Sequence, residues 1–171
     1  KAPQWEWIRE TLGLSHLPKT PALHMNEIRL APTRLTEAQQ EKLAAIVGEN
    51  QLRVDDYERA FHARGKSYHD LLYVRAGKLD MAPDGVVYPR AADEVMSVMK
   101  LAQEEDITLV PFGGGSSVVG GVNALAKSLD GAVLTVDMTM MTRVIRIDKV
   151  SMTARIEAGI YGPALEEQLQ N

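Results

Sequence analysis

The residues best suited to chemistry form a glycine- and serine-rich stretch in the second half of the chain. The stretch runs Val110-Pro111-Phe112-Gly113-Gly114-Gly115-Ser116-Ser117-Val118-Val119-Gly120-Gly121 and continues the apolar run 107–110. Glycine permits positive φ and lets the backbone approach a ligand closely, although it loses more entropy on folding. Five glycines within 113–121 therefore predict a nest of backbone N–H groups, with serine hydroxyls added, around an anion such as a pyrophosphate.

Two common phosphate-binding motifs are excluded. No Gly-Lys-Ser/Thr follows the loop, which excludes a Walker A motif, and Val118 stands where the dinucleotide pattern G-x-G-x-x-G needs its third glycine. Gly120, Gly121 and Asn123 would break a helix directly after the loop, so a bound phosphate would lie on the loop and not at a helix N-terminus. A flexible turn between strands is the alternative interpretation.

The remaining side chains predict neither a catalytic residue nor a metal site. The chain has no cysteine, which excludes disulfides, thiolate chemistry and cysteine-based zinc sites. His16, His24, His62 and His69 show no paired spacing, so we interpret each as structural or exposed. The pair Asp55-Asp56 has no third ligand at a useful spacing, and we interpret it as the start of a solvated helix.

The composition is that of an ordinary soluble globular protein. Of the 171 residues, 45% are hydrophobic and 25% charged, which suits one core or one domain with an arm. The formal net charge of −4 argues against a nucleic-acid partner. No apolar run reaches the roughly 18 residues of a membrane span.

The pattern on both sides of the glycine loop predicts an α/β unit that positions it. A short strand at 86–88, an amphipathic helix at 93–104 and a strand at 107–110 form a β-α-β unit, in which we expect the two strands to pair in parallel. The loop then lies at the carboxyl end of the second strand, where open α/β sheets bind ligands. Further strands are predicted at 132–136, 143–147 and 152–158, the last two as a hairpin.

The first half of the chain predicts less regular structure. A polar segment at 51–84 is expected to be rich in loops. Before it, the pattern predicts a helix over Trp5–Leu12 closed by Gly13, an extended linker at 16–31, and a helix with Thr36 as N-cap, Gln39 as its capping-box partner and Gly48 at its end.

These motifs resemble those of a known flavoprotein superfamily. Pro89 after a strand, the loop 111–117 and Glu157-Ala158-Gly159 are similar, in that order, to the first half of the FAD-binding domain of vanillyl-alcohol-oxidase-type (PCMH-type) flavoproteins. Within that superfamily the chain most resembles the alkyldihydroxyacetonephosphate synthase-like proteins. The stretches that carry this closer resemblance are Trp5-Glu6-Trp7-Ile8, Gly65-Lys66-Ser67-Tyr68-His69-Asp70-Leu71, Arg75-Ala76-Gly77 and Pro83-Asp84.

The resemblance implies a fold class, a cofactor and an activity. The fold is expected to be α+β, with an N-terminal helical arm (1–84) followed by the first α/β subdomain of a PCMH-type FAD-binding domain (85–171). The implied activity is a transfer in ether-lipid synthesis, in which the acyl group of acyl-dihydroxyacetone phosphate is exchanged for a fatty alcohol, with the flavin as a covalent trap and no net redox change. The residues expected to hold the FAD pyrophosphate are Pro111, Phe112, Gly113, Gly114, Gly115, Ser116 and Ser117.

The same resemblance limits what this chain is expected to do. The family's catalytic residues lie downstream of Asn171, so none is carried over, and the chain alone is expected to be inactive. The implied partners are FAD, acyl-dihydroxyacetone phosphate and a fatty alcohol, with no nucleic acid; peripheral membrane contact and a homodimer stay open. The expected location is the cytoplasm, where the protein could be peripheral to a membrane. In a eukaryote the expected location is the peroxisome. The alternatives are an FAD-dependent D-2-hydroxyacid (lactate or glycolate) dehydrogenase or oxidase, and a non-catalytic nucleotide-binding module.

Overall fold

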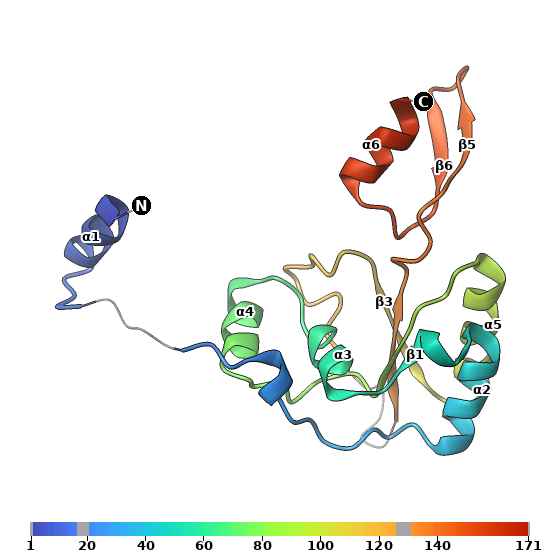
Figure 1. Ribbon diagram of the computed structural model, residues 1–171, viewed down its shortest axis with the longest axis horizontal. Coiled ribbons are helices and arrows are strands. Elements are labelled where there is room, and N and C mark those ends of the chain that lie inside the picture. The colour runs from blue at the N-terminus through green and yellow to red at the C-terminus, as the bar shows by residue number, and fades with distance from the viewer. Residues whose placement is uncertain (1, 17–20, 126–130, 171) are drawn as a thin grey trace.

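The protein combines helices with one four-stranded and one two-stranded sheet (Figure 1). The structure is a computed structural model that describes residues 2–16, 21–125 and 131–170. Its elements, in chain order, are α1 (Ala2–Thr11), η1 (Met25–Glu27), α2 (Glu37–Val47), η2 (Glu49–Gln51), β1 (Leu52–Arg53), α3 (Asp56–Phe61), α4 (Tyr68–Arg75), β2 (Gly85–Val87), α5 (Ala92–Glu104), β3 (Thr108–Phe112), β4 (Val133–Asp137), β5 (Val144–Asp148), β6 (Thr153–Ile156) and α6 (Gly162–Gln170).

The larger sheet has the strand order β1-β2-β4-β3, with β1 antiparallel to β2 and the other three strands parallel. The predicted parallel direction of β2 and β3 is confirmed, but their predicted pairing is wrong, because β4 lies between them and pairs with both. The helical crossover through α5 determines that β3 runs parallel to β2. It does not determine which strand pairs with β3. Every residue of β4 is buried, as expected for a central strand covered on both faces.

Each face of this sheet has its own apolar layer. On one face α2 and α5 lie side by side (Figure 1), and they pack Leu43, Val47 and Val98 against Leu134 and Val136 of β4. A second buried cluster is built on the strands that carry the glycine loop, and it consists of Val110, Phe112, Val122, Ala124 and Val133. The glycine loop is therefore anchored to a strand that is covered by side chains.

The predicted helix start at Thr36 is confirmed. The Thr36 hydroxyl accepts from the Gln39 amide at 3.2 Å, and the Gln39 side chain accepts from the Thr36 amide at 3.0 Å. Gly48 follows the helix with φ +99°, a conformation that favours glycine. The linker predicted at 16–31 falls partly outside the described residues, and its described part contains the short turn η1.

The segment 51–84, predicted to be rich in loops, contains the two helices α3 and α4 with loops around them. Both helices are short, and their charges are mixed, so they give only a weak apolar period. Their N-terminal caps are nevertheless ordinary: Asp55 accepts from the Glu58 amide, and Ser67 accepts from the Asp70 amide. The interpretation of Asp55-Asp56 as a helix start is thus confirmed.

The predicted hairpin is confirmed as β5 and β6, which pair antiparallel and project with α6 from the larger sheet (Figure 1). Asp148 closes their turn by accepting from the Val150 and Ser151 amides. The second strand is shorter than predicted and ends at Ile156. The Glu157 amide still donates to the Arg143 carbonyl at 2.9 Å, and the Glu157 carboxylate bonds the Arg143 guanidinium. None of the helices in the described residues is long and apolar enough to traverse a lipid bilayer.

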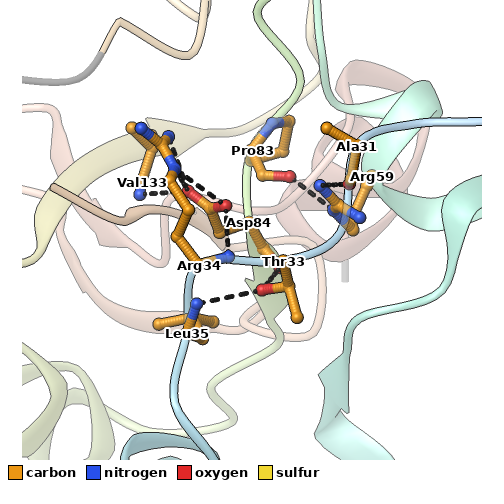
Figure 2. A network of polar contacts seen from close by, with 8 residues as sticks. All are labelled: Ala31, Thr33, Arg34, Leu35, Arg59, Pro83, Asp84 and Val133. Carbon is orange, nitrogen blue, oxygen red and sulfur yellow. Dashed lines mark hydrogen bonds and ion pairs between the residues drawn. The ribbon is translucent and has the colours of Figure 1, made fainter. Parts of the chain in front are cut away.

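A network of polar contacts around Asp84 holds the N-terminal segment against the sheet (Figure 2). One carboxylate oxygen of Asp84 accepts from the Arg34 amide at 2.8 Å, and the other accepts from the Val133 amide and from the Arg34 guanidinium, each at 2.8 Å. The Asp84 amide in turn donates to the Val133 carbonyl at 2.7 Å, and the Thr33 hydroxyl donates to the Asp84 carbonyl. Asp84 thus joins residues 33–34, the start of β2 and the start of β4.

We predict that Asp84→Asn lowers the free energy of unfolding by about 1–3 kcal/mol at pH 7, since Arg34 and the Val133 amide lose hydrogen bonds to a buried carboxylate. Burial alone would raise the pKa of Asp84, but the Arg34 side chain and the Val133 and Arg34 amides together hold it below its ordinary value. A lowered pKa contributes stability above the unfolded value of about 4, and the contribution is lost as the pH falls through the folded pKa. The difference between wild type and variant should therefore shrink between pH 5 and pH 3.

Urea denaturation of both proteins at several pH values measures this difference. The exposed Asp80 supplies the control, Asp80→Asn, which should leave stability within about 0.5 kcal/mol of wild type. A loss for Asp84→Asn that is equal at pH 7 and pH 3 would contradict the electrostatic account.

Candidate functional site

The glycine loop leaves β3 at its carboxyl end and presents a row of backbone amides. In the described part of the chain, the N–H groups of residues 113–117 donate to no protein acceptor. Gly115 has φ +62°, which turns the loop back on itself. Successive unpaired N–H groups in such a turn form an anion-binding concavity. The predicted role of the loop in holding a pyrophosphate stays a prediction, and these amides support it.

Phe112 forms the floor of this loop. Its side chain is buried, and a methyl group added at Gly115 would lie 2.3 Å from its Cζ atom. Gly115 is thus required both by its positive φ and by the aromatic ring beneath it. Phe112 is one of the seven residues predicted to hold the pyrophosphate. Its ring points into the core, so its side chain supports the backbone of the loop.

The floor itself rests on a buried histidine. The His62 ring is fully buried, 4.4 Å from the Phe112 ring between centroids, and its Nε2 atom lies 2.8 Å from Oδ2 of Asp137 at the end of β4. Its Nδ1 atom lies 2.8 Å from the Glu58 carbonyl oxygen, which can only accept, so Nδ1 donates. His62 is structural, as the sequence indicated, and it orients the ring under the loop.

Tyr88 completes the polar surroundings of His62. Its hydroxyl donates to the Glu58 carboxylate at 2.7 Å, and the two rings lie 5.9 Å apart in an edge-on arrangement. Burial, followed by the hydrogen bond to Glu58, raises the pKa of the Tyr88 hydroxyl. The hydroxyl therefore stays protonated and acts as a donor.

One side of the loop is held by a segment of the N-terminal half. The Lys66 amide donates to the Ser117 carbonyl at 2.7 Å, and the Gly65 amide donates to the Asn123 side chain at 3.3 Å. A Cβ atom at Gly65 would lie 2.1 Å from the Ser117 carbonyl oxygen, so only glycine permits this contact. The Ser117 hydroxyl accepts from the Gly121 amide at 2.9 Å and so stabilises the turn over residues 117–121.

The other side is formed by the turn that follows β6. A methyl group at Gly113 would lie 3.7 Å from the Ala158 carbonyl oxygen, and one at Gly114 would lie 3.3 Å from Tyr161. Gly159 is packed so closely that a Cβ there would lie 1.7 Å from the Met138 carbonyl oxygen. The Glu157-Ala158-Gly159 stretch quoted for the family resemblance thus lies directly beside the glycine loop.

The structure brings the predicted site residues together and adds others to them. Ser116 is exposed on the loop, whereas Ser117 is engaged in holding it. The individual assignment of Pro111 to Ser117 to a pyrophosphate stays a prediction. The neighbours that sequence reasoning gave no role at the site are Gly65, Lys66, Asn123, Tyr161 and the supporting pair His62 and Asp137. Of these, Gly65 and Lys66 lie in a stretch that carried the resemblance, but no pattern tied them to the loop.

The donor set suits a diphosphate and not a metal. Within the described ranges, no cluster of three or more histidine or acidic side chains could hold a metal ion. The loop offers amides and serine hydroxyls, contains no carboxylate, and leaves Gly114 exposed. These residues fit the diphosphate of a nucleotide cofactor, which needs donors and close approach to the backbone.

Comparison with known proteins agrees with this chemistry. Residues 83–171 match the model of a family described as FAD binding domain. The chain is 39% identical over 164 residues to an alkyldihydroxyacetonephosphate synthase of Trypanosoma brucei brucei, a match that covers 95% of this chain and 27% of the relative. It is 32% identical over 152 residues to a mitochondrial D-lactate dehydrogenase (cytochrome) of Arabidopsis thaliana, covering 88% of this chain and 24% of the relative.

The structure is also similar to solved ones. A crystal structure of an alkyldihydroxyacetonephosphate synthase superposes with a TM-score of 0.83 at 36% identity, over 90% of this chain and 28% of the other. The predicted resemblance, the α+β fold class and FAD as the cofactor are confirmed. The chain spans about a quarter of the length of the curated relatives it matches.

We predict that Gly115→Ala lowers the free energy of unfolding by about 1–3 kcal/mol and weakens flavin retention, because both φ +62° and the Phe112 ring oppose a Cβ. Gly113→Ala is the matched control, since its methyl group meets only ordinary contacts. Urea denaturation of the full-length protein, with flavin content measured after purification, compares the two. Equal stability of the two variants would contradict this account of the loop.

We also predict that His62→Ala costs about 2–5 kcal/mol, because it opens a cavity beneath Phe112 and leaves the Asp137 carboxylate without its buried partner. The exposed His69 is the control, and His69→Ala should change stability by less than about 0.5 kcal/mol. Thermal melting of the purified variants measures both. Similar melting temperatures for the two variants would show that His62 does not support the loop.

Proposed function

The chain belongs to the FAD binding domain family, and we propose that it is the cofactor-holding part of an alkyldihydroxyacetonephosphate synthase. The reaction proposed is the exchange of the acyl group of acyl-dihydroxyacetone phosphate for a fatty alcohol. A fatty acid leaves, an ether bond to the alcohol oxygen forms, and no net oxidation or reduction occurs. The 39% identity to the Trypanosoma brucei brucei synthase, over nearly the whole of this chain, carries the proposal.

The role proposed for this chain is to hold the diphosphate of FAD. The amides of residues 113–117, which have no acceptor in the described part of the chain, would donate to its oxygens. The exposed Ser116 hydroxyl would add a further donor. Bound FAD would supply the ring system at which the exchange takes place. The chain's own contribution is to fix the position of that ring by binding the distant phosphates, since a cofactor held at one end loses much of its freedom.

A D-2-hydroxyacid dehydrogenase is the second candidate. It is supported by the similarity to the Arabidopsis thaliana D-lactate dehydrogenase, which is lower in identity and covers less of this chain than that to the synthase. The role proposed for the loop is the same for both candidates. A non-catalytic nucleotide-binding module is less favoured, since the synthase and the dehydrogenase are both enzymes by name.

The remaining partners follow from the proposed substrate. A fatty alcohol resides in membranes, and the exposed Trp5 and Trp7 on α1 support peripheral contact of the protein with a lipid surface. We propose a cytoplasmic or peroxisomal location at such a surface. Homodimer formation stays a prediction.

The test is to purify the full-length protein, record its absorption spectrum and assay two reactions. We expect a bound flavin that is released as FAD, conversion of acyl-dihydroxyacetone phosphate and labelled hexadecanol into labelled alkyl-dihydroxyacetone phosphate with release of the fatty acid, and no reduction of a dye by D-lactate. A protein free of flavin would contradict the proposed cofactor role. Dye reduction by D-lactate without exchange would assign the protein to the second candidate.

A further inference from the structure

The glycine loop supplies dipoles but no full positive charge. The stretch 111–121 contains no lysine or arginine, whereas both phosphates of a dinucleotide carry negative charge. An array of neutral amides binds such a group more tightly when a cation lies beside it. A cation that supplies this charge must be attached to the loop and must not already be paired.

Lys66 meets the first requirement. Its amide donates to the Ser117 carbonyl at 2.7 Å, which fixes its backbone at the end of the amide row. Gly65 makes this close contact feasible, because any side chain there would collide with the Ser117 carbonyl. The position of Lys66 relative to the loop is thus set by the backbone and does not depend on its flexible side chain.

Lys66 also meets the second requirement. Its side chain is exposed, with Nζ 5.7 Å from the centre of the Phe61 ring, and it makes no ion pair with any carboxylate of residues 2–16, 21–125 and 131–170. The Phe61 ring lies 6.5 Å from the Phe112 ring, which forms the floor of the loop. The ammonium therefore lies on the same aromatic cluster as the loop.

The acid closest to Lys66 in sequence is already occupied. Asp70 accepts from the Ser67 hydroxyl at 2.6 Å and from the Arg64 guanidinium at 3.5 Å. Arg64 is buried, stacked on Tyr73 at 4.4 Å, and its Nε atom has no acceptor among the described residues. The carboxylate that would otherwise attract Lys66 is thus neutralised on the helix α4, and the Lys66 charge remains uncommitted.

We propose that Lys66 is a further cofactor-binding residue, whose ammonium contacts the phosphate oxygens held by the amides of 113–117. This inference rests on the proposed function and adds a charged group to the proposed diphosphate site. A lysine carries a compact charge on a flexible four-carbon stem with rotatable donors, which suits a point contact to a phosphate. The same chemistry would suit a phosphate of the substrate, so the test must separate the two sources.

The first arm measures FAD binding by the full-length protein. FAD is removed, and the dissociation constant of added FAD is obtained from fluorescence quenching for wild type, Lys66→Met, Lys66→Arg and Lys78→Met. Lys66→Met should weaken binding by about tenfold or more, as for loss of a hydrogen bond to a charged group, and Lys66→Arg should restore part of it. Lys78 is an exposed lysine outside the loop's contacts, so Lys78→Met should bind FAD like wild type.

The second arm identifies the ligand. Inorganic pyrophosphate should compete with FAD for wild type, and its competition should be weaker for Lys66→Met. Riboflavin, which has no phosphate, should bind the two proteins equally. An unchanged FAD dissociation constant in Lys66→Met would overturn the inference, and a raised KM for acyl-dihydroxyacetone phosphate would then assign Lys66 to the substrate. Failure of wild type itself to bind FAD would instead overturn the proposed function.

Discussion

The buried carboxylate of Asp84 is the interaction on which the rest of the structure depends. It lies where the N-terminal segment crosses the starts of β2 and β4, and it satisfies donors from Arg34 and Val133 at once. An anion removed from water is stable only if its hydrogen bonds are completed, so the three segments must come together for any of them to be satisfied. Figure 2 shows how close they lie, with Arg59 bonding the carbonyls of Pro83 and Ala31 beside them. The amino ends of these parallel strands are closed by this network.

At the carboxyl end of the sheet, in contrast, backbone polar groups are left without partners among the described residues. There the fold places Phe112, His62 and Asp137 in a buried group, and the amides above them have no acceptor among the described residues. An unpaired amide has a cost when water is excluded, so a rigid row of them is maintained only by the packing beneath and on both sides. Gly65 and Gly159 contribute by letting the backbone of neighbouring segments come within contact of Ser117 and Met138. The site is thus a property of several segments, although its donors come from one.

Much of the second half could be predicted from the sequence, because its patterns are local. The helix at 92–104, the hairpin and the loop after β3 follow from short-range periodicity and from glycine chemistry. The position of β4 between β2 and β3 could not be predicted in this way, because strand order depends on burial over the whole sheet and not on adjacent residues. The extent of α3 could not be predicted either, because its six residues have no apolar stripe and only its start at Asp55-Asp56 was indicated. Nor could the role of His62, whose partner Asp137 lies 75 residues away. Isolated helices of this length are marginal, so tertiary contacts and not propensity determine that α3 exists.

That short helix connects the two ends of the sheet. Arg59 and His62 stand three positions apart, and residues at this spacing share a helix face. Arg59 bonds the chain beside Asp84, while His62, at the helix end, bonds Asp137 beneath the glycine loop. A displacement of α3 would therefore disturb the closed network and the floor of the loop together. This short helix, of which the sequence indicates only the start, thus couples the stability of the fold to the geometry of the candidate site.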